Sequence, residues 1–244
     1  LLATFGVARV KVYRRLRVAL LSSGNELREP GEPLGAGQIY NSNRYCLLSV
    51  LRSLGMEVHD YEILVDELAA SRDALALAAS KWDMLITSGG VSVGEEDHLK
   101  QAIRELGELH MWRLAIQPGK PLAFGEVNGK PWIGLPGNPA AALITSLVVA
   151  RPFLLSAQGC TEVLPKPLRL TAGFAWRKPN NRRQYLRARL EQVDGEMRVC
   201  LHPRQGSAML TSASWAEGLA IVERNRTLEE GETVEYLPFS ELLG

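Results

Sequence analysis

Strand-like and helix-like segments alternate over residues 17–159, and this alternation restricts the possible folds more than any other feature of the chain. Short apolar runs have the length of buried strands, and the stretches between them carry apolar residues at helical spacing. The expected strands are 18–21, 57–65, 83–87 and 109–116, and the expected helices are 43–54, 67–81 and 97–106. Such an order predicts a parallel or mixed sheet covered by helices on both faces.

Local signals place several boundaries in this segment. Asn43 is expected to cap the helix over 43–54, which Gly55 ends. Asn128-Gly129 lies between two strand-like runs and predicts a tight hairpin.

The most apolar stretch of the chain covers residues 139–157. Arg151 and Pro152 interrupt it before the ~20 apolar residues that a membrane span needs. We therefore expect a buried helix that begins near Pro139, and no membrane partner.

The pattern changes after Gly159. Strand-like runs now recur at short spacing, and the run 184–202 reads as a hairpin around Asp194-Gly195. These signals predict an α/β domain over residues 1–160, followed by a small all-β barrel or sandwich over 161–244.

The charge balance excludes several classes of protein. The chain has 28 Lys+Arg against 27 Asp+Glu, a net charge of +1, and 46% hydrophobic residues. These values are typical of globular proteins and exclude a disordered tail, a coiled coil or a strongly basic nucleic-acid-binding protein. Neither the three cysteines nor the four histidines have the spacing of a disulfide framework or a zinc site. With no targeting signal visible we expect a cytoplasmic protein, and a first residue other than Met indicates a piece of a longer polypeptide.

Two glycine loops follow expected strands, where ligands bind in α/β sheets. The loop 88–97 can bring successive N–H groups together around an anion, and the next helix adds its positive end. The loop 134–140 places Gly137-Asn138 before Pro139, which leaves free N–H groups at a helix start. Each loop is also explained as an ordinary turn and helix start.

A third loop, 117–121, holds Lys120 between two prolines. A stiff turn of this kind suits a cation presented to a phosphate or oxyanion, although an ordinary solvated lysine is the alternative.

Three acidic residues follow expected strands or begin a helix: Glu26, Asp66 and Asp97. Each could be a helix cap or a solvated surface carboxylate. Together they would place three carboxylates at one edge of the sheet, an arrangement that suits Mg²⁺ bridged to a substrate phosphate. From the residues alone we expect an α/β domain that binds a phosphate-bearing ligand with Mg²⁺.

The loop motifs resemble the signature sequences of the molybdopterin molybdenumtransferases. These enzymes are of the MoeA type and are related to the E domain of gephyrin. The matching runs are SGGVSVGEEDHLK from Ser88, QPGKPLAFG from Gln117, GLPGNPAAA from Gly134, SSGNEL from Ser22 and GQIYNSNR from Gly37. The resemblance covers essentially the whole chain and corresponds to the C-terminal part of the family's proteins.

The resemblance implies both a fold and a reaction. The fold is a three-layer α/β/α molybdopterin-binding domain with a mixed, mostly parallel sheet, followed by a small β-barrel. The reaction is a Mg²⁺-dependent insertion of molybdenum from molybdate into adenylylated molybdopterin, with release of AMP. The family's full-length members form homodimers and carry two further N-terminal domains, one of which helps to close the active site.

Roles carry over to matching positions only. The catalytic residues implied are Glu26, Asp66, Asp97 and Lys120, and the three acids are the implied Mg²⁺ ligands. The implied substrate-binding residues are Ser88, Gly89, Gly90, Ser92, Gly94, Gly119, Pro136, Gly137, Asn138 and Pro139.

Four positions depart from the family pattern. Gln117 stands where many bacterial relatives carry a second lysine, so one cation for an anionic substrate is missing there. Asn25 and Asn41 replace a frequent aspartate, and Ala141 replaces a frequent serine.

Alternative functions stay open. A molybdopterin adenylyltransferase shares the α/β fold but normally lacks the barrel, and a non-catalytic scaffolding module of the gephyrin kind would keep both parts. A basic run that includes Arg187 and Arg189 could suggest nucleic acid. Strand alternation instead predicts that these two arginines share one solvated face, offset by acids at 229–235, so no nucleic acid is expected.

Overall fold

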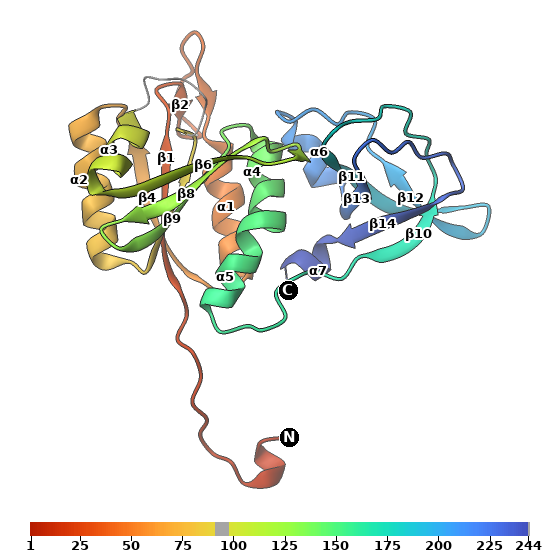
Figure 1. The fold of residues 1–244 in the computed structure, drawn as a ribbon, viewed down its shortest axis with the longest axis horizontal. Helices are drawn as coiled ribbons and strands as arrows, with labels where there is room; N and C mark the ends of the chain where they lie inside the picture. Colours follow the sequence, from red (N-terminus) through yellow and green to blue (C-terminus); the bar gives the residue numbers. More distant parts are fainter. Residues whose placement is uncertain (91–97, 244) are drawn as a thin grey trace.

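The computed structural model describes residues 1–90 and 98–243 and shows two parts side by side, an α/β part and a barrel (Figure 1). In the described residues of the first part, a six-stranded sheet has the order β4-β1-β5-β9-β8-β6. Its strands are β1 (Arg17–Ser23), β4 (Glu57–Leu64), β5 (Met84–Ser88), β6 (Gly107–Arg113), β8 (Pro121–Val127) and β9 (Lys130–Leu135). Strands β4, β1, β5 and β9 are parallel, whereas β8 runs antiparallel to both of its neighbours, β9 and β6, so the sheet is mixed as predicted.

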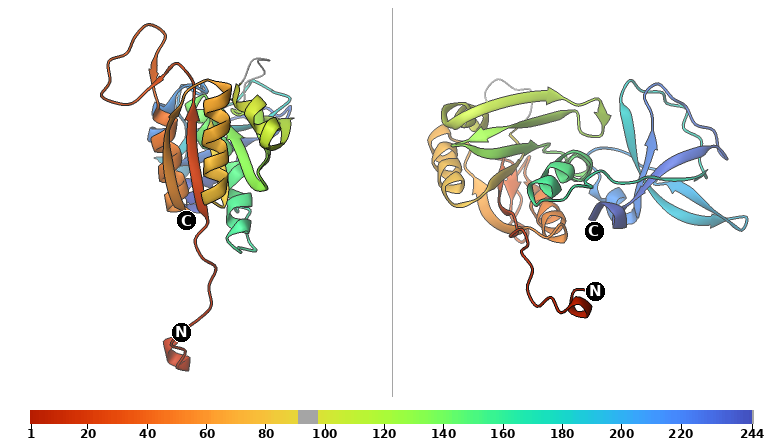
Figure 2. Two further views of the ribbon diagram at one scale, coloured as in Figure 1. Left: turned by 90° about the vertical axis from the view of Figure 1, so that its left-hand side faces the viewer. Right: turned by 60° about the horizontal axis from the view of Figure 1, so that its bottom comes forward.

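Apolar side chains leave both faces of the central strands. On β1, Val18 and Leu20 face one helix layer while Ala19 and Leu21 face the other, and all four are fully buried. One layer contains α1 (Ser42–Ser53) and the long helix made of α4 (Pro139–Thr145), a π-helical turn η2 (Ser146–Ala150) and α5 (Arg151–Ala157). The other contains α2 (Leu68–Lys81) and α3 (His98–Leu106) (Figure 2). The expected three-layer fold is confirmed.

Helix α1 is capped by Asn41 and not by Asn43, so that prediction is wrong. The Asn41 side chain accepts a hydrogen bond from the Arg44 N–H at 3.3 Å. The helix therefore begins at Ser42, two residues before the start that a cap at Asn43 would give. Asn43 lies inside the first turn, and its side chain is buried.

The Asn128-Gly129 hairpin is confirmed, and both residues have positive φ angles, 47° and 72°. This pair of left-handed residues matches the strand twist and explains why the turn needs Asn and Gly. The strand expected over 109–116 is instead divided. Strand β6 ends at Arg113, and a separate strand β7 (Ile116–Gln117) pairs in parallel with the barrel strand β11 (Arg183–Val193).

The second part is a closed antiparallel barrel apart from one parallel pair. Its strands are β10 (Leu168–Ala172), β11, β12 (Glu196–Leu201), β13 (Gly218–Val222) and β14 (Thr233–Pro238). Closure follows because β12 pairs with both β10 and β11, and the other strands complete the ring. The barrel encloses its own apolar core, which includes Val199, Ala220 and Tyr236. Two short helices, α6 (Leu210–Trp215) and α7 (Phe239–Leu243), lie against it.

The two parts share apolar packing. Tyr185, Leu219 and Leu237 of the barrel belong to the same buried cluster as Leu147 and Leu154 of the long helix. The stretch Pro139–Ala157 is long and apolar enough to cross a membrane, and 56% of its most apolar window is buried. This helix packs between the sheet and the barrel, and a helix in the core needs apolar side chains, which explains its composition.

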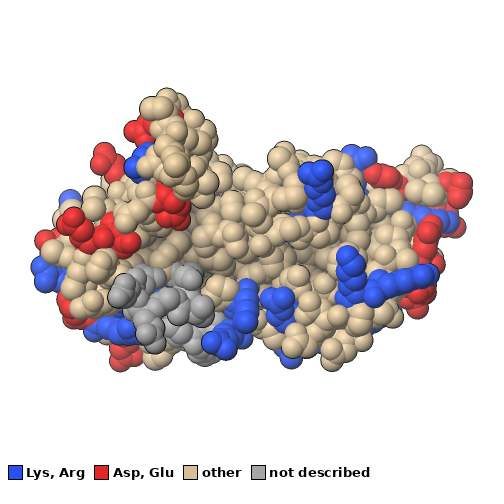
Figure 3. Space-filling view, turned by 90° about the horizontal axis from the view of Figure 1, so that it is seen from above, with Lys and Arg blue, Asp and Glu red and all other residues tan. Residues whose placement is uncertain are grey.

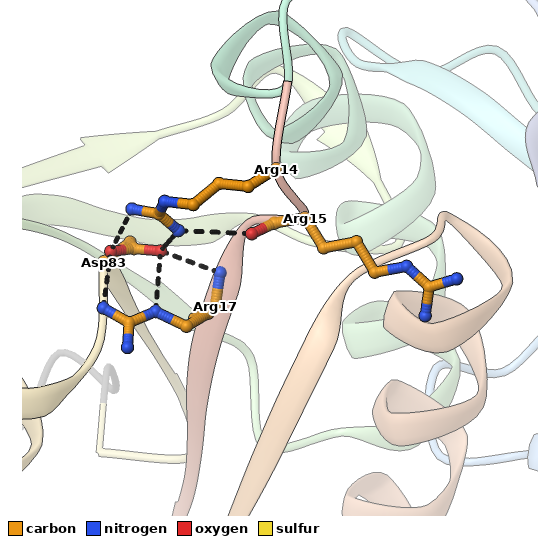
Figure 4. A network of polar contacts seen from close by, with 4 residues as sticks. All are labelled: Arg14, Arg15, Arg17 and Asp83. Carbon is orange, nitrogen blue, oxygen red and sulfur yellow. Dashed lines mark hydrogen bonds and ion pairs between the residues drawn. The ribbon is translucent and has the colours of Figure 1, made fainter. Parts of the chain in front are cut away.

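The N-terminal segment runs away from the body of the molecule (Figure 1). It carries a short 3₁₀ turn, η1 (Ala3–Phe5), and reaches the sheet through a cluster around Asp83 (Figure 4). Asp83 accepts hydrogen bonds from the Arg14 and Arg17 guanidinium groups and from the Arg17 backbone N–H at 3.0 Å. This cluster ties the chain entering β1 to the start of β5.

Near the opposite end of β1, the short strands β2 (Leu27–Arg28) and β3 (Ile39–Tyr40) pair at the base of a projecting loop.

Candidate functional site

A cavity of about 940 Å³ lies beyond the carboxyl ends of the parallel strands, between the sheet and the barrel. Segments after β1, β5 and β9 line it, as expected for a ligand site in an open α/β sheet. The 117–121 loop forms a further part of the wall. The barrel contributes Arg182 and the segment 205–208, so residues of both parts of the molecule form the wall.

The cavity brings together most of the residues singled out in the sequence. Those on its wall are Glu26, Asp66, Ser88, Gly89, Gly90, Gly119, Lys120, Pro136, Gly137, Asn138 and Pro139. Ser92, Gly94 and Asp97 lie outside the described residues. Segments separated by more than 100 residues thus meet at one concave surface. The functional roles of these side chains stay predictions.

The glycines after β5 are required by close backbone approach. Gly89 has a φ of 87°, and a Cβ atom there would lie 2.3 Å from the Ser23 carbonyl oxygen. Its N–H donates to the Leu135 carbonyl at 3.2 Å, which ties the loop to the neighbouring strand β9. Gly90 also has a positive φ, 65°, so two successive left-handed residues turn the backbone over the strand ends. Such a turn can present N–H groups to an anion.

Asn43 fixes two of the cavity loops relative to each other. Its Nδ2 donates to the Ser88 Oγ at 2.8 Å and to the Gly137 carbonyl oxygen at 2.7 Å. The side chain is buried, and its Oδ1 has no hydrogen-bond partner among the described residues. Both amide hydrogens are thus used to hold the loops after β5 and β9 against helix α1.

The 117–121 loop is also tightly placed. The Gln117-Pro118 peptide is cis, and Gly119 has a φ of 110°. A Cβ atom at Gly119 would lie 2.4 Å from the buried Thr145 Oγ1, so only glycine fits against the long helix. Lys120 follows and is exposed at the cavity, with no ion-pair partner among the described residues.

Two of the predicted acids, Glu26 and Asp66, lie on the same wall. The Glu26 carboxylate folds back over Gly24, where a Cβ atom would lie 2.6 Å from its Oε2. The Asp66 Oδ2 accepts a hydrogen bond from the Asn25 Nδ2 at 3.4 Å. Among the described residues there is no group of three or more His, Cys, Asp or Glu side chains that could hold a metal ion. Two carboxylates on the same wall as the glycine loop still fit the oxygen donors that Mg²⁺ takes together with a substrate phosphate.

Arg187 corrects a prediction from the sequence. It was expected on a solvated face but is 1% exposed. Its Nη2 donates to the Gly206 carbonyl oxygen at 3.1 Å and its Nε donates to the Ser212 Oγ at 3.0 Å. Burial lowers the pKa of this guanidinium to about 10. Strand alternation gives the face of a residue, but it cannot show that the segment 205–208 folds over that face.

The barrel side of the cavity is held in place by hydrogen bonds within the barrel and to the α/β part. The Gln205 Oε1 accepts from the Arg187 N–H at 2.9 Å, and the Gln205 Nε2 donates to the Arg187 carbonyl at 2.9 Å. The Ala140 N–H, at the start of α4, donates to the Ser207 carbonyl at 3.0 Å. The segment 205–208 therefore belongs to the same wall as the loop after β9, although no sequence motif pointed to it.

Charges are unevenly distributed over this face of the molecule. Figure 3 looks onto the carboxyl ends of the parallel strands, with lysine and arginine side chains spread along this face, its middle included, and acidic side chains mostly toward the two ends. Backbone N–H groups, Lys120 and Arg182 line the same cavity as Glu26 and Asp66. This arrangement suits a ligand with several anionic groups, part of it bridged by a cation.

Comparisons with known proteins show which family this chain resembles. A model of the probable molybdopterin binding domain matches residues 19–156, and a model of the MoeA C-terminal region, domain IV, matches residues 169–239. The molybdopterin molybdenumtransferase of Haemophilus influenzae is 38% identical over the full chain, and that of a Nostoc species is 34% identical over 80% of it. The crystal structure of the molybdopterin biosynthesis MoeA protein from Pyrococcus horikoshii superposes with a TM-score of 0.78 and 32% identity over 98% of this chain.

The chain spans only part of these proteins. It covers 61% of the Haemophilus protein, 46% of the Nostoc protein and 58% of the Pyrococcus chain. The two family models together nevertheless account for the α/β part and the barrel. The resemblance drawn from the loop motifs is confirmed, and the chain belongs to the family of MoeA-type molybdopterin molybdenumtransferases.

Proposed function

We propose that this cavity binds adenylylated molybdopterin, and that the polypeptide inserts molybdenum from molybdate into it with release of AMP, as a step in molybdenum cofactor biosynthesis. The observation that supports this most is the wall itself. It combines glycine-loop N–H groups, a lysine and two carboxylates from separate strand ends with a segment of the barrel. The barrel's contribution favours this reaction over the adenylyltransferase alternative, since that enzyme normally lacks a barrel.

The described residues suit cleavage of a phosphoanhydride. The backbone N–H of Gly90 would donate a hydrogen bond to a phosphate oxygen, and the Lys120 ammonium would stabilise negative charge that develops on the leaving phosphate oxygen. Asn43 would keep the loops after β5 and β9 at the spacing that the ligand requires. Glu26 and Asp66 would hold Mg²⁺, which supplies charge neutralisation at the anhydride when bound. A homodimer in the cytoplasm is part of the same proposal and rests on the family resemblance.

Binding of adenylylated molybdopterin to the purified chain, followed by AMP release on addition of molybdate and Mg²⁺, tests this function. We expect the unaltered chain to bind the ligand, and Lys120→Gln to weaken binding by about tenfold, since one charge-assisted contact is lost. Lys166→Gln is a matched control, because Lys166 is exposed and pairs with Glu162 away from the cavity.

Two results would contradict the proposal. One is an unaltered chain that binds neither adenylylated nor free molybdopterin. The other is equal weakening by the two lysine substitutions, which would indicate a general charge effect and not a contact in the cavity.

A further inference from the structure

The cavity wall carries an aromatic side chain, that of Tyr40, where the projecting loop returns to the α/β part. Among the described residues that line the cavity, no other side chain is aromatic. Tyr40 is 44% exposed, and in the described part of the chain no second ring stacks on it and no cation lies over it. Its ring is therefore available to a ligand.

Strand pairing and one hydrogen bond fix the place of this ring. Arg28 and Tyr40 are partners in the β2–β3 ladder, and the Asn41 N–H donates to the Arg28 carbonyl oxygen at 2.9 Å. At the far end of the side chain, the Tyr40 hydroxyl donates to the Glu32 carbonyl oxygen at 3.0 Å. Because the ring is held at both ends before a ligand arrives, little entropy is lost when a ligand packs on it.

The neighbours of Tyr40 on the wall suit a flat ring better than a phosphate. Leu27 and Ile39 also line the cavity, and Ile39 is 52% exposed. The Ile39 N–H donates to the Glu26 carbonyl oxygen at 2.8 Å, so the ladder also holds a residue with a carboxylate on the same wall. Apolar side chains and a carboxylate offer a phosphate no donor, whereas the face of an aromatic ring packs well on such a surface.

We infer that Tyr40 is a substrate-binding residue whose ring stacks on a planar heteroaromatic ring of the ligand, with Leu27 and Ile39 as its apolar surroundings. The stacked ring is either an adenine or a pterin, because both present a flat π face to a tyrosine. The inference rests on the proposed function for the identity of the natural ligand. It supplies a ring contact, which the glycine loops, the lysine and the carboxylates do not offer.

Titration calorimetry with AMP and, separately, with 6-hydroxymethylpterin tests the inference. Ribose 5-phosphate is the third probe, since it carries a sugar and a phosphate but no ring of this kind. We expect Tyr40→Ala to weaken the binding of AMP or of the pterin by about tenfold, because one stacking contact is lost, and to leave ribose 5-phosphate unaffected. The probe that loses affinity identifies the ring.

Tyr13→Ala is the matched control. Tyr13 is 76% exposed, its ring lies against Gly159, and it is not among the residues that line the cavity. The control therefore removes an exposed tyrosine ring of the same size from another place and should leave the affinity for all three probes unchanged.

Two conservative variants separate stacking from apolar burial. Tyr40→Phe keeps the ring and should retain the affinity within about threefold, because the lost hydroxyl only orients the ring. Tyr40→Leu keeps an apolar side chain without a π face and should lose nearly as much affinity as Tyr40→Ala. If Tyr40→Ala melts at a lower temperature than the unaltered chain, the comparison of Tyr40→Phe with Tyr40→Leu decides the question.

Several results would overturn the inference. They are an unaltered chain that binds neither AMP nor the pterin, unchanged affinity for both in Tyr40→Ala, and an equal loss for ribose 5-phosphate. Equal affinities of Tyr40→Phe and Tyr40→Leu would replace stacking by simple apolar contact. A lower molecular mass of Tyr40→Ala in light scattering would show that a second copy of the chain covers the ring.

These outcomes can be separated from those of the proposed function. Ring binding that depends on Tyr40, in a chain that releases no AMP from adenylylated molybdopterin, would retain the stacking contact and reject the function. AMP release with the same KM in Tyr40→Ala and in the unaltered chain would retain the function and reject the contact.

Discussion

At the scale of single residues, a change of one atom group in the Asn43 side chain is expected to lower the stability of the protein. Both of its amide hydrogens are donated to the cavity loops, at the Ser88 Oγ and the Gly137 carbonyl. Asn43→Asp keeps the shape but removes the donors and places a buried carboxylate against a carbonyl oxygen. We expect a loss of about 1–3 kcal/mol in unfolding free energy, measured by urea titration, together with weaker ligand binding.

Asn41→Asp is the matched control for this prediction. Asn41 is buried as well, but its side chain accepts a hydrogen bond from the Arg44 N–H, which a carboxylate does equally well at a helix N-terminus. Its unfolding free energy should therefore stay close to that of the unaltered chain. Equal losses in the two variants would mean that the loop hydrogen bonds of Asn43 carry no particular weight.

Residues of this kind also mark the limit of prediction from sequence. The glycine loops, Glu26 and Asp66 could be found because they follow apolar strands, and parallel strands end at one edge. Asn43 looked like a helix cap because capping is a local signal, whereas its partners lie 45 and 94 positions away. Arg182 and the segment 205–208 carried no motif. Their place on the wall depends on how the barrel docks, which residue periodicity does not encode.

At the scale of elements, the start of β5 and the segment before β1 are joined by one carboxylate. Hydrogen bonds from Arg14 and Arg17 hold the pKa of Asp83 well below its ordinary value (Figure 4). A lowered folded-state pKa contributes stability above the ordinary pKa of about 4, and this contribution is lost as the pH falls toward the folded-state value. We expect Asp83→Asn to lower the unfolding free energy at pH 7 by about 1.5–3 kcal/mol.

The pH dependence distinguishes this electrostatic role from a loss of shape. The difference between Asp83→Asn and the unaltered chain should narrow as urea titrations move from pH 7 to below pH 4, because the Asp83 carboxylate of the unfolded chain then takes up a proton while that of the folded chain is still charged. Asp73→Asn is the control, since Asp73 is 74% exposed and pairs only with the adjacent Arg72 among the described residues. A difference that stays constant over this pH range would assign the effect to packing.

At the scale of the whole molecule, the cavity depends on how the barrel is held against the α/β part. Near the cavity, β7 pairs with β11 and the Ala140 N–H donates to Ser207. Away from it, Arg151 on α5 is 8% exposed and donates to three carbonyl oxygens, those of Leu242, Glu241 and Val163. One guanidinium thus joins the long helix, the connection to the barrel and the helix α7. Burial lowers the pKa of Arg151, yet its ordinary value is so high that it stays charged at neutral pH.

Removal of this contact should loosen one of the two attachments and leave the other intact. In Arg151→Met the apolar stem still packs, but three carbonyl oxygens lose their donors, at a cost of about 1–3 kcal/mol for each one that water cannot reach. We expect faster amide hydrogen exchange in α7, unchanged protection in β7 and β11, and weaker anion binding, because the barrel wall of the cavity is less firmly placed. Arg52→Met, on the exposed side of α1, removes the same charge without these contacts and should leave all three measurements unchanged. Exchange that rises equally in β11 and α7 would show that the two attachments open together. The barrel would then be held as one cooperative unit, and Arg151 would have no separate part in setting the shape of the cavity.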